Sequence, residues 1–100
     1  MTSKTRSPAL PNVPPLADYL PNYEANVWNG LVALRNTSAN IIDKLHSEID
    51  ALLSDPTMRG RFAEVGSIPK PMTLAEFGKL IAEDTDKWEK IIRAAHIKVE

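Results

Sequence analysis

The sequence contains no cysteine, and this and other scarcities exclude several classes of protein. Without thiols the chain has no disulfide, no thiolate metal ligand and no cysteine nucleophile. The 12 Lys and Arg residues oppose 13 Asp and Glu residues, a formal charge of −1 that disfavours electrostatic binding to nucleic acid. The longest apolar run, Leu31-Val32-Ala33-Leu34, is far shorter than the ~20 residues that cross a membrane. We therefore expect no nucleic-acid partner and no membrane insertion.

Catalytic and cofactor motifs are missing as well. The 4 glycines form no phosphate-binding loop, and no serine stands in a Gly-x-Ser-x-Gly turn. His46 and His96 are far apart, and no metal-ligating residue types recur at a familiar spacing. The sequence predicts no catalytic residue, no metal site and no cofactor, and hence no enzyme. Residues 1–8 hold no apolar stretch of a signal peptide, so the chain as written is expected in the cytoplasm.

Prolines are concentrated at the start of the chain. Residues 1–21 hold Pro8, Pro11, Pro14, Pro15 and Pro21. Each proline fixes its own φ and disfavours helix at the preceding residue, which predicts an extended arm over 1–21. Only Leu16 to Leu20 is long enough for a single helical turn. A partly disordered terminus is the alternative.

One segment after the arm has the pattern of a strand. Apolar and polar residues alternate from Tyr23 to Val27, and the apolar run 31–34 follows. This pattern predicts a strand at about 23–34, buried on both faces of a sheet. Gly30 in its middle indicates a bulge or a close backbone approach.

The remaining chain is predicted to be helical at about 38–54, 56–65 and 74–95. The first helix follows the hydroxyl of Thr37, and the second follows Asp55-Pro56. The third begins with the capping box Thr73-Leu-Ala-Glu76. The fold class is therefore α+β and mostly helical, with an extended Pro-rich arm, one main strand and two to three helices. A lone strand cannot make a sheet.

Few polar residues occupy positions that need an explanation. His46 stands one helical turn before Asp50, and we expect a structural pair. Asp84 falls on the apolar stripe of the last helix, so its carboxylate needs a partner. The first interpretation is a structural pair or helix-end contact, and the second is a role in ligand binding. Trp28 and Trp88 are core residues or stacking platforms. Trp28 and Asp84 are kept as weak ligand-binding candidates.

An ordered series of motifs covers nearly the whole chain. It comprises Ser7-Pro-Ala-Leu-Pro-Asn-Val-Pro14, Leu20-Pro-Asn-Tyr-Glu-Ala25, Trp28-Asn-Gly-Leu-Val-Ala33, Ile49-Asp-Ala-Leu-Leu-Ser-Asp-Pro56, Thr73-Leu-Ala-Glu-Phe77 and Lys87-Trp-Glu-Lys-Ile-Ile-Arg-Ala-Ala95. The series resembles the C-terminal third of the tripartite tricarboxylate transporter substrate-binding proteins, the Bug-type periplasmic receptors. Where that family favours glycine, this chain has Asn22, Asn36 and His96. Asparagine commonly adopts the left-handed conformation, and histidine does so less readily.

The resemblance implies a part of a periplasmic receptor whose two α/β lobes close on a small carboxylate. Residues 22–100 then form a partial first-lobe domain, a fragment of a periplasmic-binding-protein-like lobe, after the arm 1–21. The crossover between lobes falls on Asn22, Tyr23, Glu24, Ala25 and Asn26. We expect a truncated or excised fragment that does not bind a solute alone. Its strand would pair with sequence that this chain lacks.

A free-standing helical interaction module is the alternative. The long apolar stripe of residues 74–95 and the unpartnered strand both offer surface to another chain. This interpretation predicts a homodimer formed by exchange of the strands at 23–34 or of the arms at 1–21.

Overall fold

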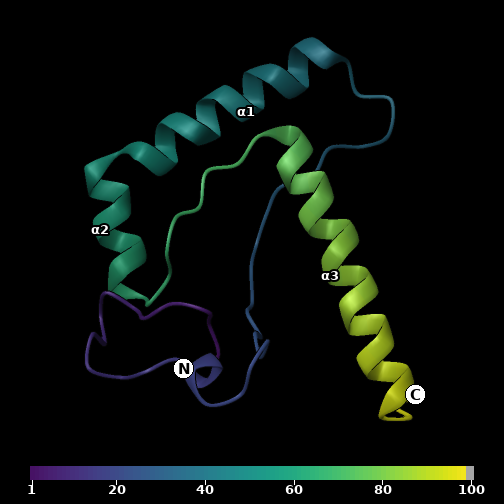
Figure 1. Ribbon diagram of the computed structural model, residues 1–100. Helices are drawn as coiled ribbons and strands as arrows, with labels where there is room; N and C mark the ends of the chain where they lie inside the picture. Colours follow the sequence, from purple (N-terminus) through teal and green to yellow (C-terminus); the bar gives the residue numbers. More distant parts are fainter. Residues whose placement is uncertain (99–100) are drawn as a thin grey trace.

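The computed structural model describes residues 1–98. Its elements are a short 3₁₀ turn, η1 (Leu16–Asp18), and three helices, α1 (Ala39–Ser54), α2 (Pro56–Glu64) and α3 (Leu74–Ala94). The three helices confirm the mostly helical class. In Figure 1, α1 and α2 meet at a corner, and α3 stands apart from both, with long irregular segments between them.

Local signals in the sequence set where α2 and α3 begin. The carboxylate of Asp55 accepts a hydrogen bond of 3.0 Å from the backbone N–H of Met58, and Pro56 takes the first helical position. At α3, the Glu76 N–H donates to Thr73 Oγ1 at 3.1 Å, and the Thr73 N–H donates to Glu76 Oε2 at 3.2 Å. Both predicted caps are therefore confirmed, and the capping box is complete.

The start of α1 differs from the prediction by one residue. Ser38 holds the cap position, and no side chain caps the helix there. The Thr37 hydroxyl donates instead to the Leu34 carbonyl at 2.7 Å, so it closes the turn that precedes the helix. This turn contains Asn36, which has a φ of 67°.

Left-handed backbone occurs at the three positions where the resemblance implies glycine. Asn22 and His96 have φ values of 64° and 54°, and Gly66, which follows α2, has 72°. The N–H of Gly66 donates to the Ala63 carbonyl at 3.0 Å, which satisfies an end group of α2.

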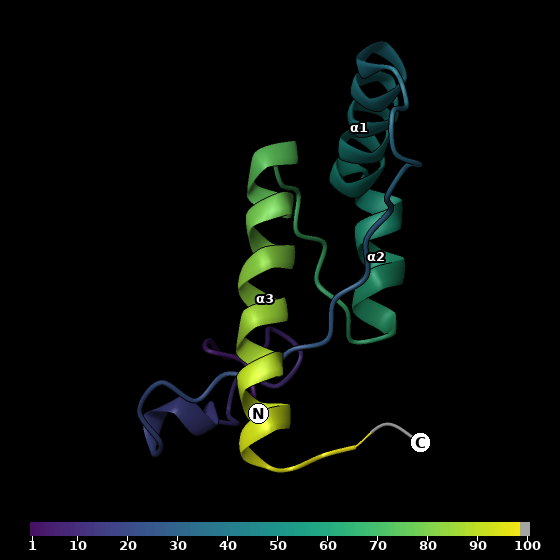
Figure 2. The same cartoon turned by 90° about the vertical axis from the view of Figure 1, so that its right-hand side faces the viewer.

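The structure corrects the predicted strand at 23–34. The segment is drawn out, but it belongs to no strand in the part of the chain that the structure describes. A ladder needs a neighbouring strand, and the described residues supply none. Figure 2 shows the segment crossing α3 and then leaving it towards the start of α1. Gly30 marks a close approach rather than a bulge, because a bulge requires a ladder.

The arm folds back on itself. The Leu16 N–H donates to the Met1 carbonyl at 2.7 Å, and the Ala25 N–H donates to the Thr2 carbonyl at 2.9 Å. The helical turn expected between Leu16 and Leu20 is confirmed as η1. Pro15, immediately before η1, is buried. These bonds place the first two residues beside η1 and the start of the segment 23–34.

No apolar core forms within residues 1–98. No large apolar side chain there is buried, and the accessible surface is 8626 Å². A compact monomer of 11.1 kDa exposes about 5,700 Å². The radius of gyration is 16.6 Å, whereas a compact domain of this length has about 13 Å. The chain therefore leaves open a large part of the surface that a folded domain covers.

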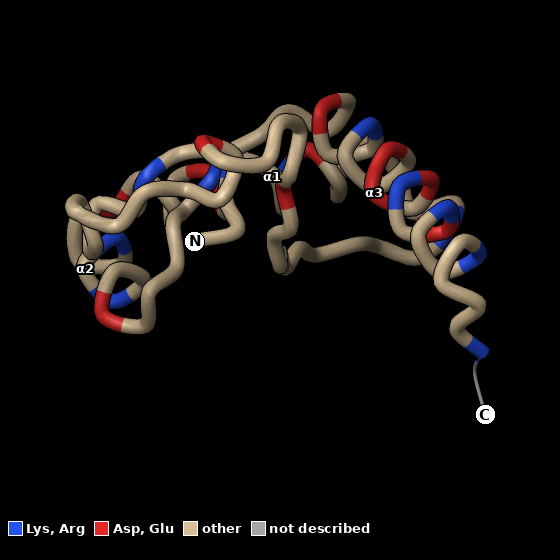
Figure 3. Tube along the Cα trace, turned by 60° about the horizontal axis from the view of Figure 1, so that its bottom comes forward, with Lys and Arg blue, Asp and Glu red and all other residues tan. Residues whose placement is uncertain are grey.

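Charged residues line the outer face of α3. Lysines and acids pair at the i,i+4 spacing, as in Lys79–Glu83 at 3.6 Å and Lys90–Asp86 at 2.7 Å. The hydrogen bond from Lys90 to Asp86, together with the charge of that carboxylate, raises the pKa of the Lys90 ammonium. Figure 3 shows basic and acidic residues interspersed along the helix. This face is solvated, and the opposite face meets the extended segment.

Candidate functional site

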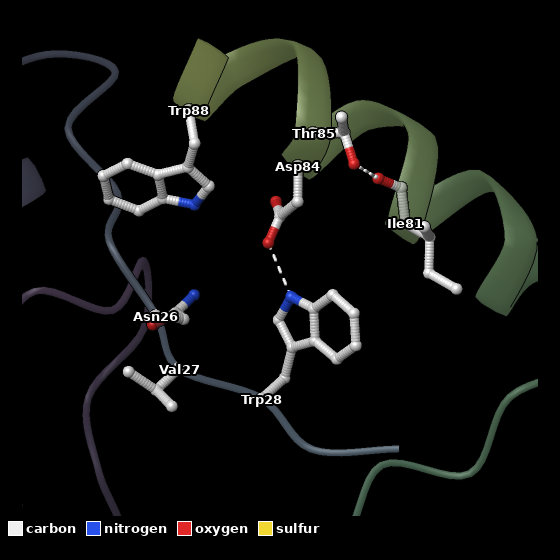
Figure 4. A pocket seen from close by; sticks show the side chains of 7 residues that line it. All are labelled: Asn26, Val27, Trp28, Ile81, Asp84, Thr85 and Trp88. Carbon is white, nitrogen blue, oxygen red and sulfur yellow. Dashed lines mark hydrogen bonds between the residues drawn. The ribbon is translucent and has the colours of Figure 1, made fainter. Parts of the chain in front are cut away.

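The two weak ligand-binding candidates meet in the structure. The indole Nε1–H of Trp28 donates to Asp84 Oδ2 at 2.5 Å and so links the extended segment to α3. Figure 4 shows the Asp84 carboxylate between the indoles of Trp28 and Trp88. Asp84 stands on the inner face of α3 because it follows Ile81 by three residues and precedes Trp88 by four. The partner that this carboxylate needs is a tryptophan donor.

A second contact lies two turns nearer the start of α3. The rings of Trp28 and Phe77 meet edge to face, with centroids 5.6 Å apart and planes at 83°. A Cβ added to Gly30 would collide with Phe77 Cζ, so the Phe77 ring occupies the space that any other side chain would fill. Glycine is therefore required for the close approach of backbone and ring.

A third contact lies towards the end of α3. The Lys87 ammonium donates to the Glu24 carbonyl and stands 5.2 Å from the centroid of the Trp88 ring. The Glu24 side chain accepts a bond of 2.9 Å from Asn26 Nδ2 and lies 3.8 Å from the Lys4 ammonium. The segment 24–30 is thus attached to α3 at three successive places.

An open hollow of about 440 Å³ lies between the segment and α3. Its lining consists of Asn26, Val27, Trp28, Ile81, Asp84, Thr85 and Trp88. The Thr85 hydroxyl donates to the Ile81 carbonyl at 2.6 Å, so its hydrogen bond is made within α3. The ionisable group of this lining is a carboxylate, which repels an anionic solute and suits a hydrogen-bond donor or a cation.

The expected crossover residues line a neighbouring hollow of about 300 Å³. Asn22, Tyr23, Glu24 and Ala25 face Lys87, Trp88 and Ile91 of α3 there. Asn26 belongs to the first hollow instead. The five crossover residues are therefore brought against α3, on both sides of the Lys87 contact.

His46 makes the expected pair and one that the sequence did not indicate. Its Nε2 lies 3.8 Å from Asp50 Oδ2, which confirms the structural pair. The same nitrogen is 2.7 Å from the Met72 carbonyl, which can only accept, so Nε2 carries the proton. His46 thus holds α1 to the segment that leads into α3.

The contacts that sequence reasoning missed depend on tertiary placement. Phe77 belongs to the predicted apolar stripe, and Lys87 belongs to the predicted charged face, but neither pattern names a partner in the segment 24–30. Across residues 1–98, no three His, Asp or Glu side chains cluster to hold a metal ion. No helix in that range is long and apolar enough to cross a membrane.

Comparison with known sequences defines the class of this chain. The profile of the family described as "Tripartite tricarboxylate transporter family receptor" matches residues 1–97. The chain belongs to this family of transport receptors, which are binding proteins, and the resemblance seen in its motifs is thereby confirmed.

Curated relatives agree with the family match. The chain is 31% identical over 94 residues to the UPF0065 protein in the clcB-clcD intergenic region of Pseudomonas knackmussii, covering 92% of this chain and 56% of that protein. It is 30% identical over 97 residues to the UPF0065 protein in the tcbD-tcbE intergenic region of Pseudomonas sp. strain P51, covering 92% and 28%. It is 27% identical over 99 residues to Protein BugT of Bordetella pertussis, covering 98% and 30%.

The chain spans about half the length of the first of these relatives and less than a third of the other two. No solved structure gives a significant match to it.

Proposed function

We propose that this chain is the C-terminal part of an extracytoplasmic solute-binding receptor for small carboxylates. The observation that carries the proposal is the match of the receptor family over residues 1–97. In this assignment the protein is not an enzyme, and its location is the periplasm, as in the full-length family. The parent receptor would act by closure of two lobes around an anion.

The surface of the chain supports its role as a fragment. Residues 23–34 have the apolar pattern of a buried strand, yet Val27, Val32 and Leu34 are 95%, 80% and 88% exposed. A first-lobe sheet supplied by the rest of a receptor would cover them. Residues 22–100 are then a partial first-lobe domain, residues 22–26 the crossover, and residues 1–21 an arm that lies on the second lobe.

The hollow beside Trp28 supports the view that the chain does not bind a carboxylate alone. Its one ionisable lining group is Asp84, and no cationic side chain lines it. A carboxylate solute placed there would face a like charge without compensation. We therefore propose that the Trp28–Asp84 bond holds the extended segment on α3 and that solute contacts come from elsewhere in the receptor.

Calorimetric titration and a chimera test these proposals. Titration of the chain with succinate and with citrate is expected to give no saturable heat at millimolar concentrations. Replacement of the matching segment of BugT with residues 1–97 is expected to give a folded receptor, because the segment completes its lobe. A chimera that remains unfolded, or strong binding of either anion by the isolated chain, would contradict the fragment assignment.

Self-association is a second candidate function, favoured by the exposed surface. The chain exposes 8626 Å², about 2,900 Å² more than a compact monomer of its size. A standard interface covers only about 800 Å² on each partner. We propose a homodimerising interaction module whose exchanged element is the segment 23–34 or the arm 1–21. Sedimentation at micromolar concentration tests it, and a single monomeric species contradicts it.

A further inference from the structure

The backbone of the extended segment has no partner within the described chain. None of the N–H and C=O groups of residues 26–33 bonds to another described residue. The groups just outside are occupied, since the Ala25 N–H donates to the Thr2 carbonyl and the Leu34 carbonyl accepts from Thr37. Free donors and acceptors along an extended segment form a template for strand addition.

Only half of one face of the segment is covered. Trp28 and Gly30 point to α3 through Asp84 and Phe77. Side chains alternate along extended backbone, so Val32 lies on the same face, yet it is 80% exposed. The cause is visible in Figures 1 and 2, where the segment leaves α3 before it reaches the turn that precedes α1. α3 covers residues 24–30 of the segment but not the residues that follow.

An antiparallel second copy would cover the other half. Two-fold pairing of the segments places residues 24–30 of one copy beside residues 30–36 of its partner. Each α3, which lies over its own residues 24–30, would then lie beside Val32 and Leu34 of the other copy. The first turns of the two helices would meet near Phe77, on either side of the axis. This pairing therefore supplies both a ladder partner and a cover for exposed apolar residues.

Charge favours the same direction of pairing. Residues 25–34 carry no charge, and Glu24 and Arg35 stand at opposite ends of that stretch. Antiparallel pairing brings the Glu24 end of one copy towards the Arg35 end of the other, whereas parallel pairing brings like charges together. The arm is less suited to exchange, because the Met1 and Thr2 carbonyls are already bonded within the chain.

We propose that the segment 26–34 is a self-complementary strand that pairs antiparallel with the same segment of a second copy, with the two-fold axis near Gly30. This proposal rests on the self-association put forward above and names its element and its geometry.

Sedimentation of three proteins tests the element. Val32→Lys places two charges close to the proposed axis, and Val32 is exposed in the single chain, so the substitution leaves that chain intact. Val65→Lys is the matched control, since Val65 is 75% exposed beyond α2. We expect the unaltered chain and Val65→Lys to sediment as dimers, and the dissociation constant of Val32→Lys to rise at least tenfold. Equal dissociation constants for all three dimers would refute the assignment of the interface to segment 26–34 but not self-association. An unaltered chain that sediments as a monomer would refute both.

Cysteine cross-linking tests the geometry, because the natural chain has no cysteine. An axis near Gly30 places residue 27 of one copy opposite residue 33 of the other. We expect an oxidised mixture of Val27→Cys and Ala33→Cys chains to give mainly the mixed disulfide dimer. Cross-linking of Val27→Cys with itself at equal or greater yield would indicate parallel pairing and overturn the proposed geometry. Circular dichroism of each variant checks that its helices remain folded.

Discussion

Replacement of Asp84 by asparagine isolates the charge in the bond that fixes the extended segment to α3. The amide oxygen of Asp84→Asn still accepts from the Trp28 indole, so the shape is kept and only the negative charge is lost. A matched control is Asp86→Asn on the same helix, because Asp86 pairs with Lys90 on the solvated face. The two variants make the same chemical change on opposite faces of one helix.

The expected magnitude follows from the geometry of the bond. A hydrogen bond to a charged acceptor contributes ~1.5–3 kcal/mol, against ~1 kcal/mol for a neutral pair. Trp28 is 39% exposed, so solvent screening places its bond at the low end of the charged range. Asp84→Asn should therefore weaken docking of the segment by about 0.5 kcal/mol, which multiplies the undocked population about twofold. Asp84→Ala, which removes the acceptor, should weaken docking of the segment on α3 by about 1.5 kcal/mol.

Exchange of the Trp28 indole N–H with water measures the undocked population of the segment directly. The chain has 2 tryptophans, so a nitrogen-15 spectrum shows two indole signals, and that of Trp88 is the internal reference. We expect about twofold faster exchange of the Trp28 signal in Asp84→Asn and about tenfold or more in Asp84→Ala, with Asp86→Asn unchanged. Unchanged Trp28 exchange in Asp84→Ala would refute the link, as would an equal effect of Asp86→Asn.

Three further substitutions test other contacts. Gly30→Ala should displace the Phe77 ring from Trp28, a contact worth ~1 kcal/mol, and so weaken the near-ultraviolet circular dichroism of the aromatic rings. The control Gly78→Ala, which has nothing within 4 Å of its added Cβ, should leave that signal unchanged. Thr73→Ala removes one bond of the capping box and should destabilise α3 by ~1 kcal/mol, seen as lower helicity. His96→Gly relieves a left-handed residue at φ 54° and should stabilise the end of α3 by ~1 kcal/mol, seen as slower amide exchange there; faster exchange would contradict this.

Much of the helical part could be predicted because its signals are local. The capping box at Thr73 and the Asp55-Pro56 pair mark helix starts within one turn of sequence, and both starts are as predicted. The predicted start of α1 is one residue early, because Thr37 and Ser38 are both good caps and the Thr37 hydroxyl is engaged by the preceding turn. A cap is decided by the backbone that precedes it, which the sequence pattern alone does not specify.

At the candidate site, the sequence predicts which residues need a partner but not which residues supply it. Asp84 stands on an apolar stripe and therefore requires a partner, but the sequence does not say that Trp28 donates to it. Gly30 likewise indicates a close approach without naming Phe77. These pairings depend on how the segment crosses α3, and that crossing joins residues more than forty positions apart. The predicted strand at 23–34 was wrong for a related reason, since a ladder requires two segments and the sequence pattern describes only one.

The apolar pattern of the extended segment has a thermodynamic consequence. Four of its side chains, Val27, Leu31, Val32 and Leu34, are 95%, 78%, 80% and 88% exposed. Burial of one such side chain contributes ~1.5–3 kcal/mol, so about 6 kcal/mol or more remains unrealised in the single chain. That amount is comparable to the whole stability of a small domain. Stability should therefore depend on whatever covers the segment, and for a second copy the thermal midpoint should rise with protein concentration. A midpoint that stays constant over a hundredfold range of concentration would mean that the chain covers these residues by itself.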